Sequence, residues 1–138
     1  MRGVIDASIA LPWFFADEKS NVSDQLLTEV YRDGAVVPVI WPIEVANALT
    51  MGFRRKRIGE TDWLASISIL AAIPIIVEPL DHPKSLSNLL PMCRKYNLTF
   101  CDAMYLELAD RLPVPLATFD KDLNQAAPSA NVQLWSPT

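Results

Sequence analysis

Apolar residues occur in two arrangements along the chain, as short continuous runs and as longer stretches with an apolar residue every three or four positions. The short runs lie at 4–5, 35–38, 75–77, 116–118 and 132–134. Short apolar runs that carry β-branched residues and are bounded by turn-forming residues predict buried strands. We therefore expect five strands, with residues 132–134 at an edge of the sheet.

The longer stretches have the spacing of amphipathic helices and lie between the expected strands. Strands that alternate with helices predict an α/β fold, with a parallel sheet covered on both faces. Pro91 falls inside one expected helix and should break or kink it. No internal repeat or linker interrupts the pattern, so residues 1–138 are expected to form one domain. The expected helices cover residues 8–16, 20–33, 42–56, 60–73, 84–96 and 99–111, and a short helix follows Asp120.

Caps and prolines set the expected helix boundaries. Ser8 and Ser20 can cap the first two helices, because a serine side chain accepts a hydrogen bond from a free backbone N–H. Gly34 should end the second helix. Pro42 is expected at the first position of the third helix, where a missing N–H is tolerated. The expected core-facing residues of that helix are Ile43, Ala46, Leu49 and Phe53.

The composition limits the possible classes of protein. Hydrophobic residues make up 51% of the 138 residues and charged residues 20%, as in globular domains. No apolar run is long enough to cross a bilayer, and the N-terminus lacks the pattern of a signal peptide, so we expect a cytoplasmic protein. Cys93 and Cys101 form no metal-binding motif and are expected to be reduced thiols. His82 is the single histidine and lies in a turn-like segment, which argues against a histidine-based mechanism.

The charge pattern is ambiguous about a nucleic-acid partner. The formal net charge of −4 argues against one, because proteins that bind nucleic acid are usually basic. The chain nevertheless contains one dense basic run, Arg54-Arg55-Lys56-Arg57. This run could contact RNA phosphates, or it could be a solvated helix end, where the helix dipole favours cations. The sequence leaves both interpretations open.

Four acids follow strands or begin helices at what should be one edge of the sheet: Asp6, Glu44, Asp102 and Asp120. Each has an ordinary explanation, as a helix cap or as a charge that the helix dipole favours. Together, however, each close pair would repel by roughly 4 kcal/mol at a moderate effective dielectric constant. A divalent cation would offset this repulsion, and Mg²⁺ or Mn²⁺ prefers carboxylate oxygens. Such an ion suits the hydrolysis of a phosphodiester by metal-activated water.

Four segments of the sequence resemble PIN-domain ribonucleases, and among these the VapC-type toxins: VIDAS (4–8), EVANAL (44–49), DAMYLELA (102–109) and LATFDKDL (116–123). The resemblance implies a PIN-like three-layer α/β/α fold with a mainly parallel sheet. It also implies a Mg²⁺-dependent endoribonuclease, with Mn²⁺ as a possible substitute, that acts as the toxin of a type II toxin–antitoxin pair. RNA would be the substrate, a VapB-like antitoxin the partner, and a homodimer the assembly.

The resemblance assigns roles to particular residues. Asp6, Glu44, Asp102 and Asp120 would form the catalytic pocket, and Asp122 would join Asp6, Asp102 and Asp120 as a possible metal ligand. Three further residues would support the acids. Ser8 and Thr118 stand where relatives carry hydroxyls, and Asn47 lies about one helical turn after Glu44 and could orient it. An ordinary polar position on the helix flank explains Asn47 equally well.

Two other functions remain open from the sequence. The same scaffold could be a binding module that holds a metal and RNA or a protein without cutting. A phosphatase of the haloacid dehalogenase type also begins with a strand that ends in Asp, but it needs a second Asp where this chain has Ser8. Aromatic residues such as Trp13 and Phe14 could line a groove for a partner or pack in the core. Metal-dependent cleavage of RNA would separate the nuclease from the binding module.

Overall fold

A parallel sheet of four short strands, in the spatial order β3-β2-β1-β4, forms the centre of the computed structural model, which describes residues 2–138. In its register, Val4 lies opposite Val36 on one side and Leu116 on the other. All residues of β1 and β2 are buried, as expected for strands covered on both faces. The strands are β1 (Gly3–Ile5), β2 (Ala35–Pro38), β3 (Ile75–Glu78) and β4 (Leu116–Ala117).

Residues 132–134 do not form the fifth strand that the sequence predicts. They contribute a single parallel bridge, between Leu116 and Leu134. The backbone N–H of Leu116 donates to the carbonyl of Gln133 at 2.9 Å, and the N–H of Trp135 donates to the carbonyl of Leu116 at 2.8 Å. The prediction was wrong because β4 is only two residues long and offers no longer edge on which a ladder could continue.

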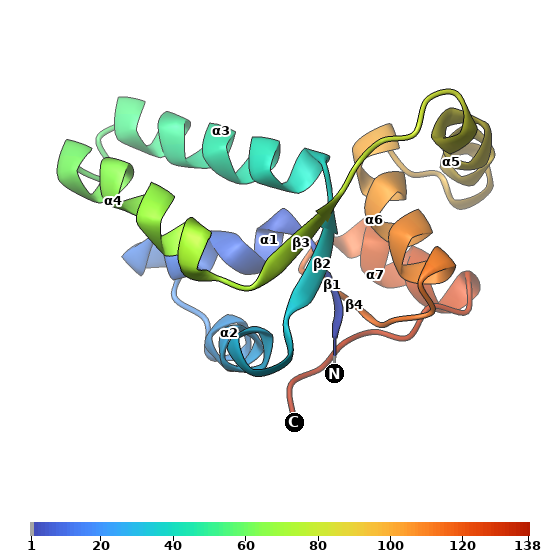
Figure 1. The fold of residues 1–138 in the computed structure, drawn as a ribbon, viewed down its shortest axis with the longest axis horizontal. Coiled ribbons are helices and arrows are strands. Elements are labelled where there is room, and N and C mark those ends of the chain that lie inside the picture. Colours follow the sequence, from blue (N-terminus) through green and yellow to red (C-terminus); the bar gives the residue numbers. More distant parts are fainter. Residues whose placement is uncertain (1) are drawn as a thin grey trace.

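Helices cover both faces of the sheet (Figure 1). On one face α6 contacts β1, β2 and β4, and α5 and α7 pack against α6; on the other face α1 packs against α3. α3 and α4 lie side by side and extend away from the sheet. This arrangement confirms the predicted three-layer α/β/α fold with a parallel sheet. The helices are α1 (Ala7–Ala10), α2 (Asn21–Asp33), α3 (Ile40–Arg54), α4 (Glu60–Ala72), α5 (Lys84–Tyr96), α6 (Phe100–Arg111) and α7 (Lys121–Ser129).

The first helix is shorter than predicted. α1 ends at Ala10, and two 3₁₀ turns follow, η1 (Leu11–Trp13) and η2 (Ala16–Glu18). Pro12 accounts for this, because it lacks the N–H that would continue the α-helical hydrogen bonding. The prediction that Ser8 caps this helix was also wrong, since Asp6 occupies the cap position and Ser8 lies inside α1.

Other predicted helix ends are confirmed. The side chain of Ser20 accepts a hydrogen bond from the N–H of Ser23 at 3.2 Å, which caps α2. Gly34 ends α2 with a φ of 79°, a conformation that a glycine adopts without the strain of a Cβ. Thr99 caps α6, and Asp120 caps α7. Local hydrogen bonding between neighbouring residues therefore determines these boundaries.

The third helix starts earlier and presents a different face than predicted. α3 begins at Ile40, which places Pro42 at its third position instead of its first. Ile43 is 57% exposed and Ala46 is exposed, so the predicted core face was wrong except at Leu49 and the half-buried Phe53. Apolar residues occupy two overlapping stripes on this helix, and packing against β2 and α1 selects between them. The buried stripe is Trp41, Val45, Leu49 and Gly52.

The fourth helix pairs with the third through aromatic residues. The ring of Phe53 stacks on that of Trp63, with centroids 4.5 Å apart. Other apolar residues of α4 lie largely at the surface, since Leu64 is 52% exposed and Ile67 is 67% exposed. α4 thus extends the fold beyond the sheet and contributes little to the central core.

The fifth helix runs through Pro91 without interruption, so the predicted break into two pieces was wrong. Pro91 is exposed, while Leu89 is buried in the core. α5 also packs along α6. Because tertiary packing anchors the helix on its inner side, the loss of one hydrogen bond on the outer side does not end it.

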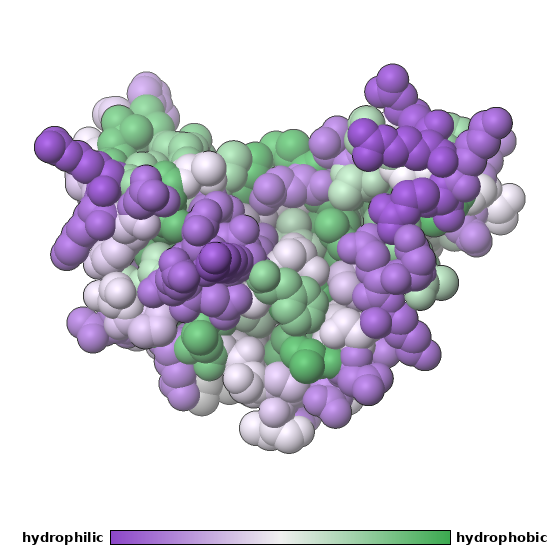
Figure 2. Space-filling view, turned by 180° about the vertical axis from the view of Figure 1, so that it is seen from behind, coloured by the Kyte–Doolittle hydropathy of each residue, from purple (hydrophilic) through white to green (hydrophobic). Residues whose placement is uncertain are grey.

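The surface of the protein is mixed in character. Figure 2 shows polar residues over much of the rear face, with smaller apolar patches among them, one of which lies on a lobe. Cys93 and Cys101 carry no disulfide and are partly buried, as predicted for reduced thiols. Within residues 2–138, no helix combines the length and the apolar character that crossing a bilayer requires.

Candidate functional site

One open pocket gathers four carboxylates that are far apart in the sequence: Asp6, Glu44, Asp102 and Asp120. Asp6 directly follows β1, Asp120 follows β4, Glu44 comes from α3 and Asp102 from the first turn of α6. Parallel strands end at one edge of a sheet, which is where ligands bind in this class of fold. No Lys, Arg or His is among the described residues that line the pocket, so its charge is negative throughout.

Asp6 is held by two hydroxyl groups. It is only 6% exposed, and its Oδ2 accepts hydrogen bonds from the hydroxyls of Ser8 at 2.8 Å and Thr118 at 2.7 Å. The hydroxyl oxygen of Ser8 in turn accepts from the N–H of Phe119 at 3.0 Å. The structure therefore places both predicted supporting residues on Asp6 and ties the end of β1 to the end of β4.

Asp120 lines the pocket and also caps α7 through a hydrogen bond. Its Oδ2 accepts from the N–H of Leu123 at 2.9 Å, and its own N–H donates to the hydroxyl oxygen of Thr118 at 2.9 Å. The side chain of Asn124 donates to the carbonyls of Thr118 and Asp120, at 3.0 and 2.9 Å. These bonds hold the turn between β4 and α7 and leave the other oxygen of Asp120 without a hydrogen bond from residues 2–138.

Glu44 is paired with a tyrosine that the sequence interpretation missed. The hydroxyl of Tyr105 donates to Oε1 of Glu44 at 2.5 Å. Burial raises the pKa of Glu44, the Tyr105 hydroxyl acts in the opposite direction, and the charge of Asp6 raises it further. Among the described residues Asn47 lines the pocket but makes no hydrogen bond to Glu44. The spacing held a signal, because Tyr105 lies three residues after Asp102 and therefore on the same helix face.

The helix dipole explains Glu44 less well than the sequence suggested. We expected Glu44 in the first turn of its helix, but α3 begins at Ile40 and has no acid in its first turn. Asp102 does lie in the first turn of α6, where its N–H donates to the Thr99 hydroxyl oxygen at 3.2 Å. The pKa of Asp102 is nevertheless raised from 3.8 to about 6, mainly by burial, then by the charge of Asp120, with smaller effects from Asp6 and Glu44.

The structure does not bring Asp122 into this pocket. Asp122 lines a neighbouring groove with Lys95, Tyr96 and Asn97, at the C-terminal end of α5. Asp122 is therefore absent from the lining of the pocket that holds the four acids, and its role as a metal ligand stays a prediction.

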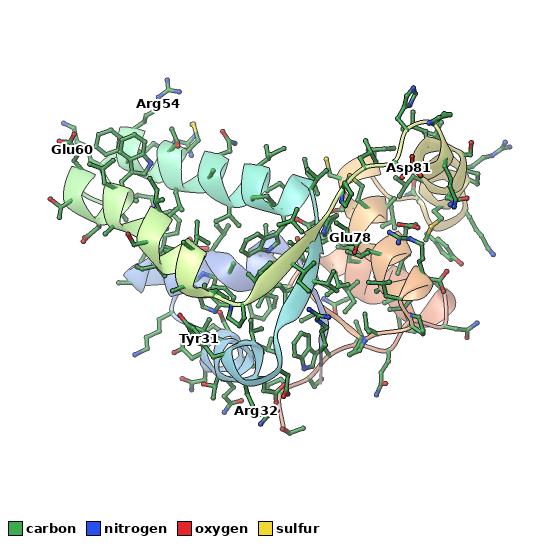
Figure 3. All side chains as sticks on the ribbon, in the orientation of Figure 1. Tyr31, Arg32, Arg54, Glu60, Glu78 and Asp81 are labelled. Carbon is green, nitrogen blue, oxygen red and sulfur yellow. The ribbon has the colours of Figure 1, made fainter. Side chains whose placement is uncertain are left out.

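The basic run lies at the end of α3 that is distant from Glu44. Arg54 points outward beside the start of α4 (Figure 3). Arg57 does not present a free cation, because its guanidinium bonds both oxygens of Asp17, at 2.9 and 3.0 Å, and Glu18 at 2.9 Å. Arg54, Arg55 and Lys56 are exposed and form no ion pair with a described residue, so they are the part of the run that an RNA phosphate could reach.

The four acids offer the type of donor atom that a hard divalent cation prefers. Their side chains, however, lie too far apart to hold one ion together. All the donors are oxygens, as Mg²⁺ prefers. Asp6 and Glu44 each use one oxygen for a hydrogen bond within the protein and keep the other free of bonds from residues 2–138. As the side chains lie, no three ligand-type residues in this part of the chain are close enough together to hold one ion. Side-chain rotation toward a shared ion would be needed.

Replacing Asp102 by Asn should stabilise the metal-free protein at pH 7.5. The pKa of Asp102 is 3.8 in a model peptide and about 6 in the folded protein, so the folded state binds this proton more tightly. The carboxylate therefore destabilises the folded state above pH 6, and the penalty disappears as the pH falls from 6 to 3.8. The variant should have a higher Tm at pH 7.5 in EDTA and a smaller gain on acidification to pH 5 than the parent.

The control for this measurement is Asp24→Asn, which makes the same chemical change at an exposed position on α2. It should leave the difference in Tm between pH 7.5 and pH 5 unchanged. Identical melting curves for the parent and Asp102→Asn at both pH values would show that neither burial nor the neighbouring carboxylates destabilise the ionised form of Asp102.

Comparison with known proteins supports the fold. The PIN domain family model matches residues 3–128, and no curated protein matches the sequence. PAE2754 from Pyrobaculum aerophilum is 24% identical, with a TM-score of 0.61 over 91% of this chain and 86% of its own. A toxin–antitoxin complex from Klebsiella pneumoniae contains a chain that is 17% identical, with a TM-score of 0.63 over 87% and 88%. VapC20 of Mycobacterium tuberculosis, described as a sarcin–ricin loop cleaving toxin, is 16% identical, with a TM-score of 0.62 over 91% and 95%.

Proposed function

The chain belongs to the PIN domain family, and on that premise we propose that it is a Mg²⁺-dependent endoribonuclease and the toxin of a type II toxin–antitoxin pair. The observation that carries the proposal is the pocket of four carboxylates without a cationic neighbour among the residues that line it. A pocket of this charge repels an RNA phosphate unless a divalent cation is bound, and with the ion it attracts one.

In this proposal Asp6, Glu44, Asp102 and Asp120 hold the ion. When bound, the ion would supply a water of lowered pKa and positive charge beside the scissile phosphate. The protein's part is to hold the carboxylates in place. Ser8 and Thr118 keep Asp6 in one orientation, and the cap of α7 keeps Asp120 beside it. Asp122, in the neighbouring groove, is not included in the proposed ligand set.

The proposed substrate is RNA, and the proposed partner is a VapB-like antitoxin. Support for the antitoxin is the similarity of the fold to a chain of a toxin–antitoxin complex, and support for RNA is the similarity to a toxin that cleaves the sarcin–ricin loop. We further propose that residues 1–138 act as one PIN domain and assemble as a homodimer. Exposed Arg54, Arg55 and Lys56 would contact RNA phosphates away from the cleavage site.

The experiment that tests the proposed function incubates the purified protein with RNA in Mg²⁺, in Mn²⁺ and in EDTA. We expect fragments with either ion and none in EDTA. Attack by water leaves no 2′,3′-cyclic phosphate, whereas attack by the ribose hydroxyl does, so the chemistry of the fragment ends is read by mass spectrometry. Cyclic phosphate ends or cleavage in EDTA would contradict metal-activated water.

The alternative is a binding module that holds RNA without cutting it. This module would hold a metal and RNA or a protein on the same scaffold, and the pocket of four carboxylates suits it as well as it suits a nuclease. The same incubation decides between the two functions when binding is measured beside cleavage. RNA that is retained but remains intact in both Mg²⁺ and Mn²⁺ would establish the binding module and reject the nuclease.

A further inference from the structure

Tyr105 is a buried residue whose only side-chain polar atom is bonded to the candidate site. The residue has an exposure of 0%, and its ring is part of the core. Its hydroxyl nevertheless reaches the pocket wall and donates to Oε1 of Glu44 at 2.5 Å. A hydrogen bond from a hydroxyl to an ionised carboxylate is charge-assisted. The Tyr105 hydroxyl is thus a hydrogen-bond donor that reaches from the core to Glu44.

The phenol also connects the elements that carry the acids. Tyr105 lies on α6, one turn after Asp102, while Glu44 lies on α3. The backbone N–H of Ala7, the residue after Asp6, is close enough to the phenol oxygen to act on its pKa. A single hydroxyl on α6 is therefore bonded to Glu44 on α3 and acted on by the N–H at the start of α1, directly after Asp6.

The hydroxyl remains a donor under all physiological conditions. A tyrosine hydroxyl ordinarily has a pKa of about 10 and so carries its proton at neutral pH. The phenol therefore keeps its proton and must direct it to an acceptor. Because Oε1 of Glu44 accepts the hydrogen bond from the phenol, Oε2 is the oxygen left without a bond from the described residues and available to a ligand in the pocket.

We propose that Tyr105 is a positioning residue that orients Glu44 toward the metal ion, a role that rests on the proposed function. Without the phenol, Glu44 can rotate about its side-chain bonds, and ordering it on binding costs conformational entropy. Asn47, for which the sequence suggested this role, makes no bond to Glu44 among the described residues. Partners that orient a metal ligand in this way typically change the metal affinity 10- to 100-fold.

The test measures the dissociation constant of Mn²⁺ by electron paramagnetic resonance, with no RNA present. Tyr105→Phe removes the hydroxyl and keeps the ring that fills the core. We expect it to bind Mn²⁺ at least about 10-fold more weakly than the parent. Tyr31→Phe is the matched control, because Tyr31 is 51% exposed on α2, away from the pocket (Figure 3). It should bind Mn²⁺ like the parent.

A second variant separates positioning from a merely structural role. If Tyr105 acts through Glu44, then Tyr105→Phe should weaken Mn²⁺ binding no further in a Glu44→Ala background, which lacks the oxygen that accepts from Tyr105. A structural role would weaken both backgrounds by the same factor. Equal affinities of the parent and Tyr105→Phe, or equal losses in the two backgrounds, would overturn the inference.

The measurement also distinguishes this inference from the proposed function. A parent that binds Mn²⁺ but leaves RNA intact would reject the nuclease, and the comparison of Tyr105→Phe with the parent would still decide the role of Tyr105. A parent that binds no Mn²⁺ at millimolar concentration would overturn both the proposed metal site and the positioning of Glu44 for it.

Discussion

Asp6→Asn is expected to lower the rate of Mg²⁺-dependent RNA cleavage by about 10²- to 10³-fold, the loss typical when one group that stabilises the transition state is removed. Asn has the shape of Asp, and its carbonyl oxygen can still accept from Ser8 and Thr118, which now hold Oδ2 of Asp6. The variant should therefore fold as the parent does. What it loses is the negative charge at the centre of the pocket, which a divalent cation requires.

The measurement is the initial rate of RNA cleavage at saturating Mg²⁺, with circular dichroism to establish that the variant is folded. Asp24→Asn serves as the control, because Asp24 is exposed on α2 and does not line the pocket. It should cleave at the rate of the parent. A folded Asp6→Asn variant that retains the parent rate would remove Asp6 from the proposed site and point to a contaminating nuclease.

Phe15→Ala is expected to lower the free energy of unfolding by about 3–5 kcal/mol, the cost typical of removing a buried phenylalanine. Phe15 is 2% exposed and packs directly on Gly52, where an added Cβ would lie only 2.5 Å from the ring. The guanidinium of Arg57 also lies over the ring, 4.2 Å from its centroid. Alanine would leave a cavity between the segment after α1 and the end of α3, and the packing contacts between these two segments would be lost.

Urea unfolding followed by circular dichroism measures this loss. Phe119→Ala is the matched control, because Phe119 is 46% exposed and the same substitution there should change the free energy of unfolding by at most about 0.5 kcal/mol. If Phe15→Ala cost no more than Phe119→Ala, the ring of Phe15 could not be the anchor between these two segments.

The sequence determined the elements whose signals are local. The four strands were predictable from short apolar runs bounded by turn residues, although β3 is partly exposed and the similar run at 132–134 forms only a bridge. Ser20, Thr99 and Asp120 marked helix starts through bonds to residues three positions away. The same locality explains the failures. Ser8 is a residue type that commonly caps helices, but its hydroxyl donates to Asp6 instead. Pro91 is a residue type that commonly breaks helices, but α5 continues through it because the helix packs against α6.

The candidate site was predictable in its acids and not in its supports. Asp6, Glu44, Asp102 and Asp120 could be selected because the topology of a parallel sheet brings strand ends and helix starts to one edge. Tyr105 looked like any core residue in an apolar helix, and Arg57 like any cation in a basic run. Only the folded chain places the Tyr105 hydroxyl on Glu44 and pairs Arg57 with Asp17, because both contacts join residues about 40 or more positions apart. Contacts at such separations depend on how helices pack, which no local pattern encodes.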